Sequence, residues 1–300
     1  MSPKSFDRKR FGGYRQLRTM RVAQELETEQ RGSGAAGRLP AVAQSARDHA
    51  FVVLAYRESP FLEGCLACLR AQTLQSQVLI TTSTPSKFIA GVAEAYGAPV
   101  IVNPRRDGIA CDWNFGLRAT AARFVTLAHQ DDTYAPDFLA QTLEQFERRD
   151  AVLCFTGYQE VDDEGRPKSS RISRAKHLIE LITLGRRHVV RGFALRTFLS
   201  FGNPLPCSSV TFDTSRLGDF NFTPHYAANL DWEAWWRLRE RGETFLRAPT
   251  RLVGRRHNDL TATSRLILDG TRRREDLEMF RHAWPRLIAD VIAAAYRFGY

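Results

Sequence analysis

The chain has 300 residues, 43% of them hydrophobic, and a formal net charge of +10. This length supports one large core with a small appendage, so a single α/β domain with tails is expected and no second independent domain is required. The five cysteines are odd in number and scattered, and no charged-then-apolar leader opens the chain. These features argue against a secreted disulfide scaffold and favour a cytoplasmic setting. Residues 291–296 form an apolar run far shorter than the ~20 residues of a membrane-spanning helix, so any membrane contact is expected to be peripheral, at the inner face.

Half of the net positive charge lies in the first 48 residues. Residues 1–48 hold ten Lys/Arg and five Asp/Glu, which leaves residues 49–300 with an excess of five positive charges. That excess suits an anionic small molecule or an anionic membrane surface, and the absence of a basic stripe interleaved with aromatic residues argues against nucleic acid. Residues 1–48 also lack a sustained apolar period, so they are predicted to be a flexible basic tail. Their G-x-G-x-x-G match at 32–37 follows no strand and precedes Pro40, and is attributed to chance.

From residue 51 onwards, short β-rich runs alternate with segments of helical period. The expected elements are strands at 51–56, 77–82, 99–103 and 124–128, with helices at about 60–71, 85–96 and 110–122 between them. This alternation predicts parallel strands covered by helices, with the active site at the carboxyl ends of the strands. The later elements expected are strands at 151–158 and 208–212, helical segments at about 175–200 and 229–241, runs at 244–248 and 251–256, and a long amphipathic helical region to the end.

The first chemical motif is His129-Gln130-Asp131-Asp132, directly after the strand at 124–128. At this position one carboxylate can bind a divalent ion and the other can accept hydrogen bonds from a ribose. The ion would neutralise the charge that develops on a departing nucleoside diphosphate. A helix N-cap with an acidic first turn explains the motif equally well. The same dipeptide at Asp162-Asp163 precedes Gly165 and is interpreted as a turn.

The second motif opens the helix predicted at 229–241, which Gly242 ends. Asp231 lies in its first turn, where the helix dipole stabilises the charged carboxylate and keeps it available as a base. Glu233, two residues on, points to a different face. The tryptophans of this helix are interpreted as core, with sugar contact as the lesser alternative for Trp232 and Trp236.

The third motif is Arg255-Arg256-His257, at the end of a short β-rich run. A neutral imidazole at His257 can complete a metal site, and Arg255 can bind diphosphate oxygens in a bidentate way. An isolated surface histidine is the alternative.

Taken in order, the acidic pair after the fourth strand, Asp231 with its flanking residues, and Arg255-x-His257 resemble the family-2 inverting glycosyltransferases of the GT-A fold. The resemblance covers roughly residues 50–260. It implies an α/β fold with a Rossmann-like, mainly parallel sheet, helices on both faces and additional C-terminal helices. It also implies a nucleotide-sugar donor, Mn²⁺ or Mg²⁺, and transfer to a hydroxyl of a glycan, lipid-linked or small-molecule acceptor, as in polysaccharide biosynthesis. The expected domains are the tail at 1–48, the transferase at 49–260 and a helical extension at 261–300.

The resemblance assigns roles to individual residues. Asp131 would contact the ribose or diphosphate, Asp132 the metal, and Asp231 would deprotonate the acceptor. Asn114 lies in a segment similar to the Asn/Gly pattern of the family, although a turn or capping role explains it nearly as well.

One departure concerns the nucleobase. Where the family usually has Asp-Asp-Gly-Ser after the second strand, this chain has Thr82-Ser83. Their hydroxyls can hydrogen-bond a base edge, but the missing carboxylate leaves the donor base open. Two alternatives are therefore kept: a nucleotidyltransferase on a related fold, which usually has a Gly-rich loop after the first strand, and a catalytically silent nucleotide-sugar-binding module.

Overall fold

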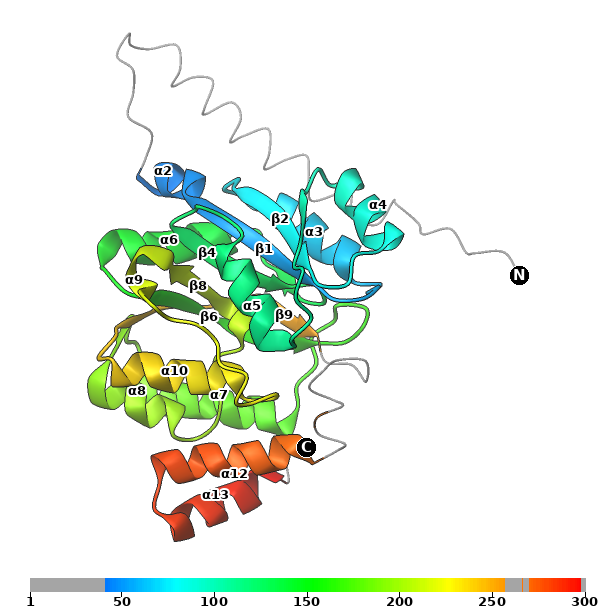
Figure 1. The fold of residues 1–300 in the computed structure, drawn as a ribbon. Coiled ribbons are helices and arrows are strands. Elements are labelled where there is room, and N and C mark those ends of the chain that lie inside the picture. Colours follow the sequence, from blue (N-terminus) through cyan, green and yellow to red (C-terminus); the bar gives the residue numbers. More distant parts are fainter. Residues whose placement is uncertain (1–40, 257–265, 267–269, 298–300) are drawn as a thin grey trace. The chain divides into compact units, whose positions relative to one another are not determined.

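The structure is a computed structural model that describes residues 41–256, 266 and 270–297. Its central feature is one mixed β-sheet with helices on both faces (Figure 1). The described strands of the main path follow the order β3-β2-β1-β4-β8-β6-β9-β5, with β7 paired to β9. The predicted α/β class, with helices on both faces of the sheet, is confirmed.

The first half of the sheet is parallel. It consists of β1 (His49–Ala55), β2 (Gln77–Thr82), β3 (Val100–Val102) and β4 (Phe124–His129). Strands β1, β2 and β4 lie within two residues of their predicted positions because each is a run of buried, β-favouring side chains. Their carboxyl ends meet at one edge, which carries Thr82, Ser83 and the acidic pair.

The second half mixes directions. It contains β5 (Thr133–Tyr134), β6 (Leu153–Val161), β7 (Val189–Val190), β8 (Val210–Asp213) and β9 (Phe245–Arg256). Strand β8 runs antiparallel to both β4 and β6, whereas β6 and β9 are parallel. The two runs predicted at 244–248 and 251–256 are one strand. The pairing of β6 with β9 shifts register on either side of Gly157. This irregularity lies opposite the middle of β9, where Pro249 has no N–H to donate to the neighbouring strand.

Alternating side chains of the strands form two hydrophobic cores. On β1, Phe51 and Val53 face one core and Val52 faces the other, as the two-residue period of a strand requires. The first core is covered by α2 (Ala41–Arg47), α3 (Leu62–Arg70), α4 (Lys87–Ala95) and α6 (Phe138–Arg148). The second core includes residues of α5 (Ile109–Arg118), α7 (Arg171–Leu184), α8 (Gly192–Leu199), η1 (Cys207–Ser209), α9 (Thr214–Leu217), α10 (Leu230–Glu240), α12 (Thr271–Ala283) and α13 (Arg286–Arg297).

Structured elements lie beyond both ends of the segment predicted as the transferase, residues 49–260. Helix α2 lies inside the segment predicted as tail, with Ala46 buried and Val42 packed against the same core. A seven-residue helix is too short to produce a recognisable apolar period. At the other end, α12 and α13 contribute Met279, Phe280 and Ala289 to the second core. Among the described residues, none of the helices combines the length and apolar composition required to span a lipid bilayer.

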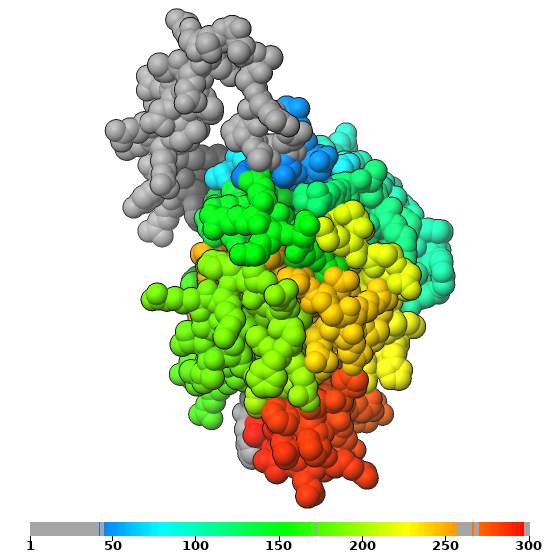
Figure 2. Space-filling model, turned by 90° about the vertical axis from the view of Figure 1, so that its left-hand side faces the viewer, coloured from blue at the N-terminus to red at the C-terminus, as the bar shows by residue number. Residues whose placement is uncertain are grey.

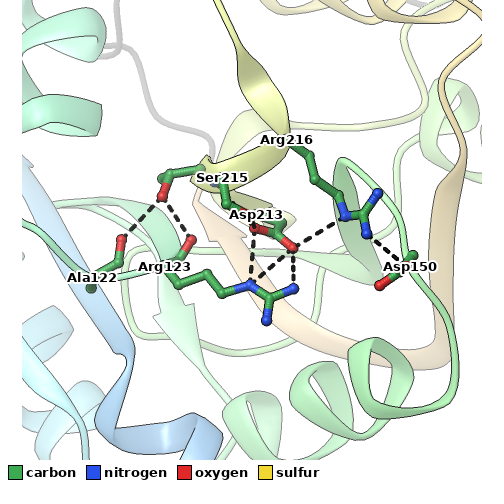
Figure 3. Close-up of polar contacts among 7 residues, drawn as sticks. Ala122, Arg123, Asp150, Asp213, Ser215 and Arg216 are labelled. Atoms are coloured by element: carbon green, nitrogen blue, oxygen red, sulfur yellow. Dashed lines mark hydrogen bonds and ion pairs between the residues drawn. The ribbon is translucent and has the colours of Figure 1, made fainter.

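A buried carboxylate fixes β8 at the amino end of β4, opposite the edge that carries the acidic pair (Figure 3). Asp213 is 1% exposed and accepts from Nη2 of Arg123 at 2.7 Å, while Nε of Arg216 lies 3.6 Å away. Arg216 also pairs with Asp150 at 2.6 Å. This ion-pair network is structural, because breaking it would leave a buried charge unpaired.

Candidate active site

The acidic pair occupies a tight turn at the carboxyl end of β4. The N–H of Asp132 donates to the carbonyl of His129 at 3.1 Å, which closes the turn. Asp132 is buried, and its Oδ1 accepts from the backbone N–H of Arg256 at 3.0 Å. Asp131 is half-buried. The sequence prediction that the pair lies at the sheet edge is therefore matched by the geometry, with the two carboxylates in different environments.

Arg256 holds this turn in place. Its Nε donates to the carbonyl of Asp131 at 3.0 Å, and its Nη1 donates to the carbonyl of Asp162 at 2.6 Å. Its guanidinium also lies 4.2 Å from the centre of the Phe61 ring. The turn at Asp162-Asp163 is thus tied to the acidic pair by an arginine that the motif analysis left without a role.

A third side chain of a type that can bind a metal lies beside the pair. One ligand atom from each of His129, Asp131 and Asp132 lies within 4.8 Å of the others. Within the described part of the chain, Nε2 of His129 is buried and has no hydrogen-bond partner. Burial and the neighbouring Asp131 raise the pKa of Asp132 to about 7, and burial lowers the pKa of His129. Two carboxylates and an orphaned imidazole form a donor set that fits a divalent cation. His257, the histidine predicted to bind the metal, lies outside the described residues.

Asp231 lies in the first turn of α10, as predicted. It is half-buried, and its Oδ1 accepts from the N–H of Trp232 at 2.9 Å. Its negative charge raises the pKa of His129, against the larger lowering effect of burial, so Asp231 lies within electrostatic range of His129. Glu233 is engaged elsewhere, in an ion pair with Arg237 at 2.5 Å and a hydrogen bond from Thr223 at 3.2 Å.

The tryptophans of α10 belong to the core. Trp232 and Trp235 are fully buried, and their indole N–H groups donate to the carbonyls of Leu199 and Leu205 at 2.9 and 3.0 Å. Trp236 is 4% exposed. This burial favours the core interpretation over sugar stacking.

The amino end of α10 is held by α12. The carboxylate of Glu275 accepts from three successive backbone N–H groups, those of Ala227 and Ala228 at 2.8 Å and of Asn229 at 2.9 Å. Asn229 also donates from Nδ2 to Asp276 at 2.9 Å. These contacts fix the segment that leads into Asp231. Sequence analysis missed them because no local pattern marks a bond across 46 residues.

A carboxylate also lies beside the predicted nucleobase residues. Oγ of Ser83 donates to Oδ2 of Asp112 at 3.0 Å, and Nδ2 of Asn103 donates to Oδ1 at 2.9 Å. Ser83 and Asn103 are buried, whereas Asp112 is half-buried. Oγ1 of Thr82 accepts from the N–H of Thr84 at 3.0 Å. A carboxylate from the first turn of α5 therefore lies beside Ser83, directly after β2.

Two further predicted residues have different surroundings. The side-chain amide of Asn114 bonds both the N–H and the carbonyl of Phe222, each at 2.7 Å, a geometry that favours a structural role. Arg255 is half-buried. Its positive charge acts to lower the pKa of Asp132 and the pKa of the buried Lys176 of α7. Burial, followed by the charges of Arg272 and Arg255, lowers the pKa of Lys176 to about 7.

The sequence profile of the family described as Glycosyl transferase family 2 matches residues 50–203, just over half of the chain. No curated protein matches the sequence. The chain belongs to glycosyl transferase family 2 and is a glycosyltransferase.

Solved structures share the fold at low sequence identity. The mannosyltransferase PcManGT from Pyrobaculum calidifontis, in complex with GDP-Man and Mn²⁺, has a TM-score of 0.60 at 13% identity, over 92% of this chain and 80% of that one. Residues 1–349 of S. aureus TarS with UDP-GlcNAc give 0.56 at 12% identity, over 83% and 71%. Glucosyl-3-phosphoglycerate synthase from Mycobacterium tuberculosis with phosphoglyceric acid gives 0.51 at 16% identity, over 80% and 84%. These similarities confirm the GT-A architecture.

Proposed function

We propose that the protein transfers a sugar from a nucleoside-diphosphate sugar to an acceptor hydroxyl in one displacement, with inversion. The carboxylate of Asp231 takes the hydroxyl proton while the acceptor oxygen forms a bond to the anomeric carbon. The bond from that carbon to the diphosphate breaks, and its electron pair stays on the departing phosphate oxygen. The observation that carries this proposal is the position of Asp231 in the first turn of α10, within electrostatic range of His129 beside the acidic pair.

We propose that Asp132 and His129 bind a divalent cation, Mn²⁺ or Mg²⁺, with Asp131 shared between the cation and the ribose or diphosphate. The orphaned Nε2 of His129 supports this donor set. When bound, the cation supplies charge neutralisation for the leaving diphosphate. Arg255 is the proposed diphosphate contact, because a guanidinium binds phosphate oxygens in a bidentate way.

For the nucleobase, we propose Asp112, together with Ser83 and Thr82. A carboxylate accepts hydrogen bonds from base N–H groups, and each oxygen of Asp112 has acceptor capacity beyond the single bond it makes here.

We also propose the limits of the catalytic unit and its setting. The unit begins at α2 rather than at residue 49, and it extends beyond residue 260, because α12 holds the amino end of α10. The proposed acceptor is a hydroxyl of a glycan or lipid-linked molecule, reached through peripheral contact with the inner face of a membrane.

Replacing Asp231 tests the mechanism. Asp231→Asn keeps the size of the side chain and removes its basicity, so transfer should fall by a factor of about 10²–10⁴ while donor affinity persists. Glu233→Gln is the matched control on the same turn, because its carboxylate is paired with Arg237. Sugar transfer and donor binding are measured on both variants. If Asp231→Asn turns over at the wild-type rate, Asp231 is not the base.

A further inference from the structure

One short stretch of the chain is strongly basic. Residues 166–200 contain nine Lys/Arg and one acid, a net of +8, against +10 for the whole chain. The one acid, Glu180, accepts from Nε of Arg247 at 2.9 Å, so its charge is compensated. Seven of the nine basic residues are exposed and have no acidic partner among the described residues: Lys168, Arg171, Arg174, Arg186, Arg187, Arg191 and Arg196.

The outer face of α7 combines this charge with exposed apolar side chains. Leu178, Leu181 and Ile182 are 56%, 64% and 72% exposed. They lie three and four residues apart and therefore share one face of the helix, which Arg174 joins from one turn before. Leu178 and Leu181 border an open hollow of about 360 Å³ rather than a packed core. In Figure 2, the yellow-green region that includes α7 and α8 lies at the surface on the face turned towards the viewer.

The opposite side of α7 is buried. Lys176 is buried, and the charges of Asp231 and Arg255 act on it. Its ammonium also lies 5.9 Å from the centre of the Tyr296 ring. The basic and apolar stripe is therefore the solvent-facing side of a helix whose other side packs into the protein.

A second exposed apolar face lacks this charge. On α13, Leu287 and Val291 are 82% and 70% exposed, but Asp290 lies next to Val291 and pairs with Arg281 at 2.8 Å. Residues 271–297 contain six Arg and four acids, a net of +2. The two faces thus offer similar apolar area and differ in electrostatic potential.

We propose that the outer face of α7, with Arg171, Arg174, Arg186 and Arg187 around its apolar stripe, docks on an anionic phospholipid bilayer. Apolar side chains flanked by Lys/Arg are the chemistry that binds the interface of such a membrane, by apolar insertion and by attraction to the lipid head groups. This inference specifies the membrane contact proposed above. It rests on that proposal, but lipid binding can be measured without any sugar transfer. A negative result for membrane docking is therefore distinguishable from a negative result for the transferase activity.

Vesicle co-sedimentation of the full chain tests the proposal. Wild-type protein should bind vesicles of phosphatidylcholine with phosphatidylglycerol, bind phosphatidylcholine alone weakly, and dissociate as salt is raised, because salt screens exposed charges. Leu178→Glu/Ile182→Glu should weaken binding about tenfold or more, since it removes apolar insertion and adds repulsion. Leu287→Glu/Val291→Glu makes the same change at the same spacing on α13 and should leave binding unchanged.

Arg171→Gln/Arg174→Gln removes charge without touching the apolar stripe and should also weaken binding, which keeps the test valid if the glutamate pair unfolds the protein. The proposal is overturned if wild-type protein does not bind anionic vesicles. It is equally overturned if the Leu287→Glu/Val291→Glu variant loses vesicle binding while the α7 variants keep it. It is also overturned if the glutamate pair on α7 converts a dimer to a monomer in sedimentation velocity with no change in lipid binding, because that face would then bind a second copy.

Discussion

At the scale of single residues, Asp112 is the proposed nucleobase contact. The family usually has a carboxylate after β2, where this chain has Ser83. Asp112 comes from α5 and lies beside Ser83, and its carboxylate accepts from Ser83 and Asn103. Two buried neighbours orient its carboxylate, so it is positioned before a ligand arrives.

We therefore expect Asp112→Asn to weaken nucleoside diphosphate binding by about tenfold, since a hydrogen bond to a charged group contributes roughly 1.5–3 kcal/mol. Asp107→Asn is the control, because Asp107 is exposed nearby and pairs with Arg105 at 2.7 Å. Titration calorimetry of both variants measures the effect. Equal losses in the two variants would indicate a general charge effect rather than base recognition.

His49 makes native stability sensitive to acid. It is fully buried at the start of β1, where its ring nitrogens bond Ser76 at 3.0 Å and Thr126 at 2.9 Å. Burial lowers its pKa from 6.5 to about 3. Below pH 6.5 the imidazole is protonated in the unfolded chain but stays neutral in the native state. The free energy of unfolding therefore falls as the pH falls towards 3.

The expected contribution of this group is up to ~1.4 kcal/mol per pH unit across that window. His49→Gln cannot take up the proton, so its free energy of unfolding should fall less steeply with acid, even if it is lower at neutral pH. Urea unfolding at a series of pH values gives both slopes. Parallel slopes would mean that His49 titrates alike in the folded and unfolded chains.

At the scale of elements, α12 supports the helix that carries the proposed base. Glu275 accepts three backbone N–H groups that α10 and its leading turn cannot satisfy themselves. Glu275→Gln replaces one acceptor oxygen with an amide N–H, so it should loosen this turn and misplace Asp231.

We expect Glu275→Gln to lower kcat by about tenfold or more, with little change in donor affinity, because misplacement affects the transfer step more than donor binding. Glu278→Gln, exposed on the same helix, is the control. Steady-state kinetics and donor titration separate the two effects. A loss of thermal stability with unchanged kcat would make Glu275 structural only.

Local sequence pattern marks the longer buried strands but not the shortest strands or the long-range contacts. Strands β1, β2 and β4 were located well because buried β-favouring runs mark them, and topology then placed Asp131 and Asp132 at the sheet edge. Strands β5 and β7 are two residues long and leave no pattern. The contacts of Asp112, Arg256 and Glu275 join residues 29, 124 and 46 positions apart, so only the folded chain reveals them.

At the scale of the whole molecule, the two halves of the sheet have different tasks. The parallel half brings Ser83, Asp112 and the acidic pair to one edge, where a nucleotide sugar would bind. The mixed half and its helices bring Asp231 and Arg255 towards that edge and expose the basic face of α7. C-terminal helices α12 and α13 share the second core, so the proposed acceptor side is built from residues far apart in the chain.

Metal-dependent binding of nucleoside diphosphates tests the central claim most directly. We expect UDP or GDP to raise the melting temperature of the wild-type protein with Mn²⁺ and much less with EDTA, because a ligand that binds only the folded state stabilises it. Asp132→Asn should lose the metal-dependent part. Asp163→Asn, the same change at the exposed turn, should keep it. An equal shift with and without Mn²⁺, or an undiminished metal effect in Asp132→Asn, would contradict the assignment of this site.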